Sequence, residues 1–258
     1  MLILLPPSEG KRAPRRGNRL RPERWPATLA APRQQILTAL VSLCEDDPEQ
    51  AAKVLGLGPG QADEVRRNAR LLTAPTARAD GIYTGVLYEA LDVAGLSPPA
   101  RGRATRWLAI VSSLFGLVRP GEPIPAYRLS GNTTLPGIGS VAGHWRGHLD
   151  LVVRDALGKG LLVDLRSSTY SAFWRPAPDL APRVAGVRVL HEVDGTRQVV
   201  SHFNKATKGR LVRALLEDGA SPRTPSALAS HLSALGWTVE TGEPTAKGAR
   251  LDVVVSGI

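Results

Sequence analysis

The chain has 258 residues, enough for one large α/β domain or two small ones. Its only cysteine, Cys44, excludes an internal disulfide framework and a cysteine-rich zinc module. Lys and Arg number 33 against 23 Asp and Glu, so the formal net charge is +10. Such an excess favours nucleic acid, acidic cofactors or anionic surfaces as partners, although surface arginine also accumulates through compositional drift alone.

The chain opens with an apolar run, Leu2–Leu5, which predicts a short buried strand ended by Pro6 and Pro7. This run is too short for a signal peptide, and no later run approaches the ~18 apolar residues of a membrane span. We therefore expect a soluble, cytoplasmic protein without a membrane partner. Residues 12–32 are rich in Arg and Pro and are expected to be irregular, and residues 10–24 form a basic cluster.

A helix is expected over 33–43, and a helix-hairpin-helix-like element over about 47–72. Asp47 can cap its first helix, Gly56 and Gly58 break it, and Pro59 opens a second helix with Leu72 on its apolar face. Glycines let the backbone approach a phosphate, and a helix amino terminus donates N–H groups to it. The candidate DNA-binding residues are therefore Gly56, Gly58, Arg66, Arg67 and Arg70. An ordinary helical corner is an equal alternative, and the acidic residues over 45–49 argue against a DNA face.

Further along the chain, strands are expected over 107–111 and 161–165, and a hairpin over 184–201 with Asp194-Gly195 at its turn. Helices are expected over 147–157, 205–216 and 225–235, and closing strands over 237–240 and 251–255. Strands and helices alternate without a clear linker or repeat. The expected fold is a single mixed α/β (α+β) domain over 1–258, in which helices flank a central mixed β-sheet.

Four polar loops follow predicted strands, at 8–11, 112–119, 166–170 and 201–208. Ligands of open α/β sheets bind beyond the carboxyl ends of the strands, so these loops are expected to converge on an anion. Each loop alone could simply cap its own helix. The candidate anion-binding residues are Ser8, Lys11, Ser113, Arg119, Arg128, Arg166, Lys205, Lys208 and Arg210.

If the cleft is catalytic, cations would fix the substrate and hydroxyls or an imidazole would move protons. The candidate residues for that case are Lys11, Arg128, Lys205, Ser168, Tyr170 and His202. No metal site is predicted. His144 and His148 lie four residues apart and would face the same way on a helix, as metal or haem ligands do, but no acidic third ligand accompanies them.

Short segments in a fixed order resemble the YaaA family of peroxide-stress proteins. They are residues 2–11, Tyr83-Thr84-Gly85, 113–120, 125–129, Trp145, 165–170, 201–205 and 208–210. The resemblance implies a bacterial cytosolic protein with a mixed α/β fold, a positively charged cleft, a helix-hairpin-helix-like element and DNA binding. It also implies a role in limiting damage from hydrogen peroxide and unincorporated iron.

Two functions remain open at this point. The first is a DNA-binding protein of the response to hydrogen peroxide that holds phosphates in a basic cleft. The alternative is an enzyme that acts on a nucleotide, nucleobase or other small anionic metabolite in the same cleft. Thiol peroxidase chemistry is not expected, because Cys44 has an apolar context and no resolving partner.

Overall fold

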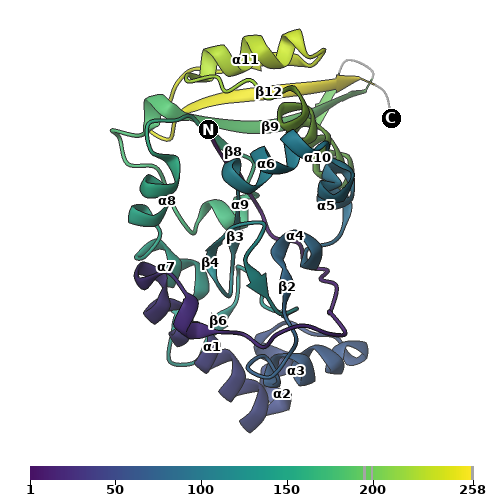
Figure 1. The fold of residues 1–258 in the computed structure, drawn as a ribbon, viewed down its shortest axis with the longest axis vertical. Coiled ribbons are helices and arrows are strands. Elements are labelled where there is room, and N and C mark those ends of the chain that lie inside the picture. The colour runs from purple at the N-terminus through teal and green to yellow at the C-terminus, as the bar shows by residue number, and fades with distance from the viewer. Residues whose placement is uncertain (194–195, 199, 257–258) are drawn as a thin grey trace.

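The computed structural model describes residues 1–193, 196–198 and 200–256 (Figure 1). Within them, one sheet of eight strands has the order β11-β12-β9-β8-β1-β3-β4, with β10 beside β9. The strands of this sheet are β1 (Leu2–Leu5), β3 (Leu108–Ser112), β4 (Gly116–Val118), β8 (Leu162–Asp164), β9 (Val184–Val193), β10 (Thr196–Gln198), β11 (Thr238–Thr241) and β12 (Ala249–Ser256).

Strand β1 lies inside the sheet, between β8 and β3. Its four side chains are apolar and at most 1% exposed, as expected for a strand that is covered on both faces. It runs parallel to β3 on one side and to β8 on the other. Strands β9 and β12 continue the parallel arrangement, whereas β4, β10 and β11 are antiparallel to their neighbours. The expected mixed sheet is therefore confirmed, and the carboxyl ends of β1, β3 and β8 share one edge.

Helices cover the sheet and form a separate group at one end of the molecule. Helix α10 packs on α5, α6 and β9, while α11 packs on β9, β11 and β12 from the other side (Figure 1). The helices are α1 (Ala27–Asp46), α2 (Pro48–Val54), α3 (Ala62–Ala69), α4 (Ala79–Ile82), α5 (Val86–Leu91), α6 (Pro98–Trp107), α7 (Val141–Arg146), α8 (Asp150–Leu157), α9 (Ser168–Ser171), α10 (Ser201–Asp218) and α11 (Pro225–Ala234).

Helices α1, α2 and α3 pack on one another at the end of the molecule opposite α11 (Figure 1). Two small ladders join the loops between these parts. They are β2 (Ala77–Arg78) with β5 (Pro123–Ile124), and β6 (Thr134–Leu135) with β7 (Gly139–Ser140).

Several sequence expectations need correction. Helix α1 begins at Ala27, six residues before the expected start, and includes the buried Pro32. The helix expected over 147–157 begins only at Asp150, as α8. His144 lies on the separate helix α7, which ends at Arg146, so His144 and His148 do not share one helix. Leu72 is 47% exposed and lies outside α3. Strands β9 and β10 pair as the hairpin requires, while its Asp194-Gly195 turn lies outside the described residues.

Candidate functional site

Lys11 lies at the edge of the sheet where β1 ends, and it is the best-defined cation of the predicted cleft. Its backbone bridges to Tyr83, and its Nζ donates to the Ser8 carbonyl at 2.8 Å. The Nζ also lies 4.2 Å from the ring centroid of Tyr127 and 5.6 Å from that of Tyr83. Two aromatic faces thus hold the ammonium by cation–π attraction.

Burial lowers the pKa of the Lys11 amine from 10.5 to about 8. Glu9 and Glu64 oppose this shift, whereas the guanidinium groups of Arg128 and Arg67 reinforce it. Roughly a tenth of the Lys11 side chains would then be neutral at pH 7. A neutral amine is a nucleophile and a proton acceptor, so this lysine is chemically distinct from an exposed one.

A chain of hydroxyl groups lies beneath Lys11. The Tyr127 hydroxyl is 3.0 Å from that of Tyr83 and 2.8 Å from Ser112 Oγ. Ser112 Oγ in turn accepts the Phe115 N–H at 3.0 Å. Burial raises the pKa of both tyrosines, so these hydroxyls stay protonated and act as neutral hydrogen-bonding groups.

Arg128 forms the second cationic point of the site. Its Nη1 lies 2.8 Å from Glu9 Oε2, and its Nε is buried without a hydrogen-bond partner in the described part of the chain. The buried side chain of Asn68 fixes the backbone here, since its amide donates to the Arg128 carbonyl at 2.7 Å and accepts the Arg128 N–H at 2.9 Å. Asn68 belongs to α3, so the second helix of the hairpin is attached directly to the Lys11 site.

The hydroxyl groups predicted for this cleft differ in their burial and in their hydrogen-bond partners. Ser8 Oγ donates to the Gly10 carbonyl and accepts the Thr84 N–H, which holds the loop after β1 in place. Ser113 Oγ donates to the Leu129 carbonyl at 2.5 Å and is buried. Tyr170 is 7% exposed and lies close enough to Ser113 and Glu9 for both to affect its pKa, which burial raises.

Two predicted anion-binding arginines hold the fold together instead. Strand β4 is antiparallel to β3 and carries the chain back to the opposite edge of the sheet. Arg119 follows β4, and its Nη1 donates to the Leu108 carbonyl there. Arg166 is buried, and it pairs with Asp164 at 2.7 Å and donates to two backbone carbonyls. Both arginines thus donate to partners within the protein, and their place in a common anion-binding cleft stays a prediction.

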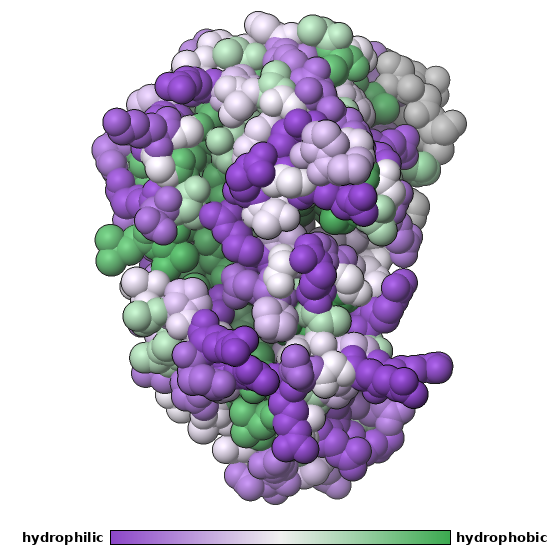
Figure 2. All heavy atoms as spheres, viewed as in Figure 1, coloured by the Kyte–Doolittle hydropathy of each residue, from purple (hydrophilic) through white to green (hydrophobic). Residues whose placement is uncertain are grey.

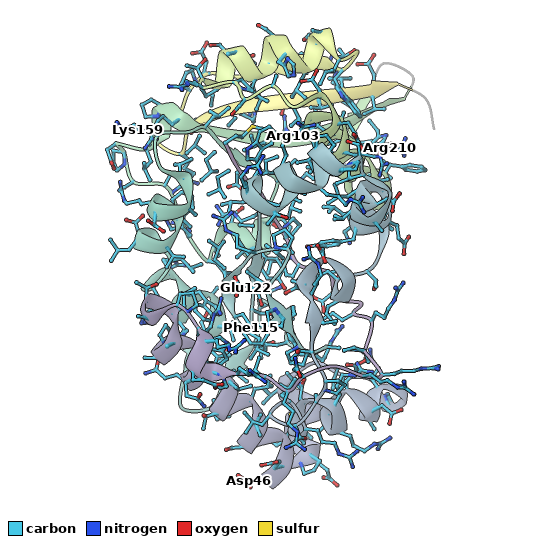
Figure 3. All side chains as sticks on the ribbon, in the orientation of Figure 1. Asp46, Arg103, Phe115, Glu122, Lys159 and Arg210 are labelled. Atoms are coloured by element: carbon cyan, nitrogen blue, oxygen red, sulfur yellow. The ribbon has the colours of Figure 1, made fainter. Side chains whose placement is uncertain are left out.

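Among the predicted residues of α9 and α10, Tyr170 lies close to the Lys11 site, whereas the others have different surroundings. Lys208 Nζ donates to the Leu165 carbonyl at 3.0 Å, and burial lowers its pKa. Lys205, Arg210 and Ser168 are exposed, and the His202 side chain lies outside the described residues. Figure 3 shows Arg210 beside α10, far along the molecule from Asp46, the last residue of α1 before the hairpin. Among the described residues, Lys205, Arg210 and Ser168 make no hydrogen bond or ion pair with Lys11, and their place in a common anion site stays a prediction.

The hairpin has the expected order of helix, glycine turn and helix, with a short 3-10 turn at Pro59–Gln61 before α3. Gly56 has a φ of 63°, which only glycine adopts readily. The N–H groups of Gly56 and Gly58 already donate to the Lys53 carbonyl and to Gln61 Oε1. Their role as phosphate donors thus stays a prediction that would require these bonds to be exchanged.

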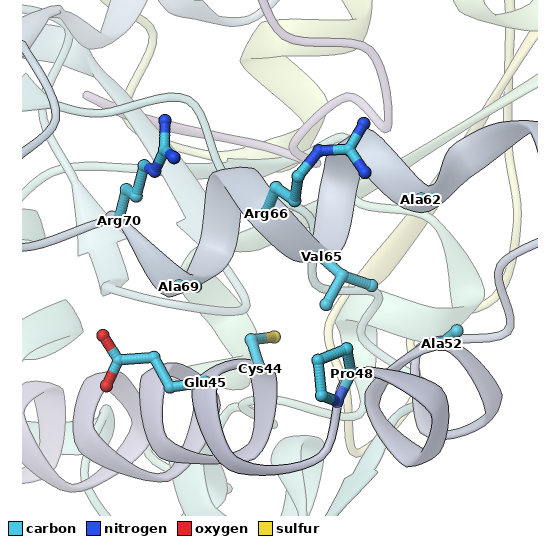
Figure 4. A pocket seen from close by; sticks show the side chains of 9 residues that line it. All are labelled: Cys44, Glu45, Pro48, Ala52, Ala62, Val65, Arg66, Ala69 and Arg70. Atoms are coloured by element: carbon cyan, nitrogen blue, oxygen red, sulfur yellow. The ribbon is translucent and has the colours of Figure 1, made fainter.

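Two of the hairpin arginines have acidic partners: Arg66 pairs with Asp63, and Arg67 with Glu64. Figure 4 shows Arg66 and Arg70 above a hollow of about 320 Å³ between α1, α2 and α3, with Cys44 at its base. Burial raises the pKa of the Cys44 thiol to about 11, so this cysteine is a weak nucleophile.

The histidine pair has its own structural partners. His144 Nε2 lies 3.1 Å from the Pro32 carbonyl, and the two imidazole centroids are 4.9 Å apart. Within the described residues, no group of three His, Cys, Asp or Glu side chains could hold a metal ion. In the same residues, no helix has the length and apolar character needed to cross a membrane.

Sequence reasoning missed Asn68, Tyr83 and Tyr127 as parts of the site. Asn68 lies on the helix that was singled out for its arginines, but the asparagine itself gave no functional signal. The two tyrosines stand in the segments 83–85 and 125–129, which were noted for their resemblance alone. The cation–π contacts of their rings with Lys11 depend on the folded arrangement, so the sequence did not indicate them.

Comparison with known proteins gives a consistent result. Residues 1–242 match the family model described as peroxide stress protein YaaA. A UPF0246 protein of Streptomyces coelicolor is 50% identical over 259 residues, which cover 99% of this chain and 98% of the relative. UPF0246 proteins of Corynebacterium efficiens and Corynebacterium glutamicum are 41% and 38% identical, over 94% and 93% of this chain and 96% and 95% of the relatives.

Proposed function

Because the chain belongs to the peroxide stress protein YaaA family, we propose that it binds DNA through the phosphate backbone as part of the response to hydrogen peroxide. The binding surface would consist of the basic segment 12–24 and helix α3, which border Lys11 on two sides. Base edges would contribute little, since arginines in irregular segments contact phosphates without reading sequence.

The observation that carries this proposal is a set of exposed arginines without acidic partners. All six arginines of the segment are exposed, and none forms an ion pair in the part of the chain that the structure describes. They are Arg12, Arg15, Arg16, Arg19, Arg21 and Arg24. Figure 2 shows hydrophilic side chains projecting from the half of the molecule that this segment crosses in Figure 1.

The segment is held in place along its length. The Arg12 N–H donates to the Ile82 carbonyl at 2.8 Å, and the Asn18 carbonyl accepts both the N–H and the hydroxyl of Thr76. Arg19 bridges to Pro75, five residues after Arg70 at the end of α3. Because its backbone is ordered by these contacts, the segment would lose little conformational entropy on binding.

Salt dependence tests this proposal. Six phosphate contacts would reduce the affinity for a duplex about a thousandfold between 50 and 200 mM salt, because each contact releases counterions. Fluorescence anisotropy with two duplexes of unrelated sequence should show this decrease for both. Absent or salt-insensitive binding would contradict the proposal.

The second candidate function is an enzyme that acts on a nucleotide, nucleobase or other small anionic metabolite. The observation that favours it is the Lys11 amine with its lowered pKa, above the hydroxyls of Tyr83, Tyr127 and Ser112. Calorimetric titration with nucleoside mono- and triphosphates distinguishes the two functions. Micromolar binding that Arg128→Ala removes, with duplex binding retained, would favour the enzyme.

A further inference from the structure

We infer that Lys11 captures abasic sites in DNA, by forming an imine between its Nζ and the C1′ aldehyde of the sugar that has lost its base. This inference rests on the proposed DNA binding and names the class of DNA lesion that the Lys11 site would take. An abasic sugar in its open form carries an aldehyde between two phosphates. At the Lys11 site, the guanidinium groups of Arg128 and Arg67 lie close enough to the amine to affect its pKa, and Arg12 follows it in the chain.

The Lys11 amine has backbone carbonyls, and no carboxylate, as its hydrogen-bond partners in the described part of the chain. Lys11 Nζ donates to the backbone carbonyls of Ser8 and Glu9, at 2.8 and 3.4 Å. The carboxylate of Glu9, which would be its natural counterion, pairs with Arg128. Arg128 thus competes with Lys11 for the Glu9 carboxylate. Glu9 still raises the pKa of Lys11, but burial, together with the guanidinium groups of Arg128 and Arg67, outweighs it and favours the neutral amine.

The Lys11 amine is accessible and has cations nearby. Lys11 is half-buried, and its neighbours Glu9 and Gly10 are exposed, so the loop opens to solvent. Arg12 follows directly in the chain, and Arg67 of α3 lies close enough to affect the Lys11 pKa. Phosphates on either side of an abasic sugar would meet these cations. Such a sugar also rotates out of the duplex at low cost, because it has no base to unstack.

The surroundings of Lys11 also suit the product of the reaction. The ring of Tyr127, with its centroid 4.2 Å from Nζ, attracts a cation at the nitrogen whether that cation is an ammonium or a protonated imine. In the reaction, the neutral amine adds to C1′ and forms a carbinolamine. The carbinolamine loses its hydroxyl group and one proton as water, which leaves the C=N bond. Hydrolysis reverses the step, and no oxidant or reductant takes part.

Reductive trapping tests the inference. A duplex with one abasic site is mixed with the protein, borohydride reduces any imine to a stable amine, and a denaturing gel separates the adduct. Lys11→Arg keeps the positive charge but cannot form an imine, because guanidinium remains protonated. Lys53→Arg is the matched control, since Lys53 is an exposed lysine on α2 of the hairpin. All proteins are compared at saturating DNA, so that differences in affinity do not affect the yield.

Wild type and Lys53→Arg should give equal yields, Lys11→Arg should give at least about 50-fold less, and peptide mapping should place the adduct on Lys11. An undiminished yield in Lys11→Arg, or an adduct on the Met1 amine, would overturn the inference. So would equal labelling of Lys11 by glyceraldehyde 3-phosphate at the same concentration, which would indicate a small-molecule site. Binding of intact duplex without any adduct would contradict only this inference. The absence of all duplex binding would contradict the proposed function as well.

Discussion

Two groups of arginines in this protein differ in the partners that their side chains have. Around the central sheet, Arg33, Arg119 and Arg166 turn inward, and their guanidinium groups donate to backbone carbonyls or pair with carboxylates. Along 12–24, six arginines point outward without acidic partners among the described residues. The first region uses its arginines to stabilise the fold, and the second leaves them available to an external anion.

The largest effect is expected where an inward arginine is removed. Arg166→Met would leave the Asp164 carboxylate buried without its partner, which costs about 3–5 kcal/mol of unfolding free energy. Arg166 at present lowers the pKa of Asp164 despite its burial. Urea denaturation measures the loss. Arg15→Met, in the outward region, should change stability by less than about 0.5 kcal/mol, and an equal loss in both variants would erase the distinction.

A smaller loss is expected at Asn68, which joins α3 to the Lys11 site. Asn68→Leu leaves the N–H and the carbonyl of Arg128 without partners and should cost about 2–4 kcal/mol. Asn68→Asp keeps the acceptor and should lose about half as much. The same denaturation assay compares them, and a neutral Asn68→Leu would mean that the backbone finds other partners.

The pH dependence of Lys11 separates it from the outward cations. Acylation of its amine should rise with a midpoint near pH 8 in the folded protein, and near pH 10.5 in urea. Because the folded pKa is the lower one, the unfolded chain binds more protons between these values, and the Lys11 contribution to stability increases with pH across that window. Peptide-resolved mass spectrometry follows the labelling. A folded midpoint near 10.5 would remove the basis for a reactive amine.

The smallest effects distinguish arginines within the proposed DNA surface. Arg12→Gln should weaken duplex binding a few-fold and reduce the salt slope by about one unit, because an unpaired charge is lost. Arg66→Gln should do less, since Asp63 already offsets that charge. Anisotropy titrations at several salt concentrations compare them. Equal effects would show that the Asp63 pairing does not matter on DNA.

The elements of the sheet could be predicted well from sequence because their signals are local. Buried apolar runs placed β1, β3 and β8 within a residue or so, and Asp194-Gly195 indicated the pairing of β9 with β10. Helix α1 was harder. Pro32 lies inside it, and packing of the buried side chains of Leu29, Ile36 and Leu40 against the core overrides the usual rule that proline ends a helix.

The site was less predictable because it depends on strand direction and on partner choice. The loop after β3 was expected to carry Arg119 to the cleft, but β4 turns back and takes it to the other edge of the sheet. Arg166 was expected to face a ligand, but Asp164 lies two residues before it and binds it. Lys11 and Arg128 both contact Glu9: Arg128 pairs with its carboxylate, and Lys11 Nζ donates to its backbone carbonyl. The Arg128 guanidinium also lowers the pKa of the Lys11 amine.

The salt slope of duplex binding tests most directly whether the outward arginines hold phosphates. We expect the logarithm of the binding constant to fall with the logarithm of salt concentration with a slope of about −5 for wild type, at about 0.9 per phosphate contact. A variant with Gln at Arg12, Arg15, Arg16, Arg19, Arg21 and Arg24 should keep its stability and lose nearly all of this slope. An unchanged slope in that variant would contradict the account.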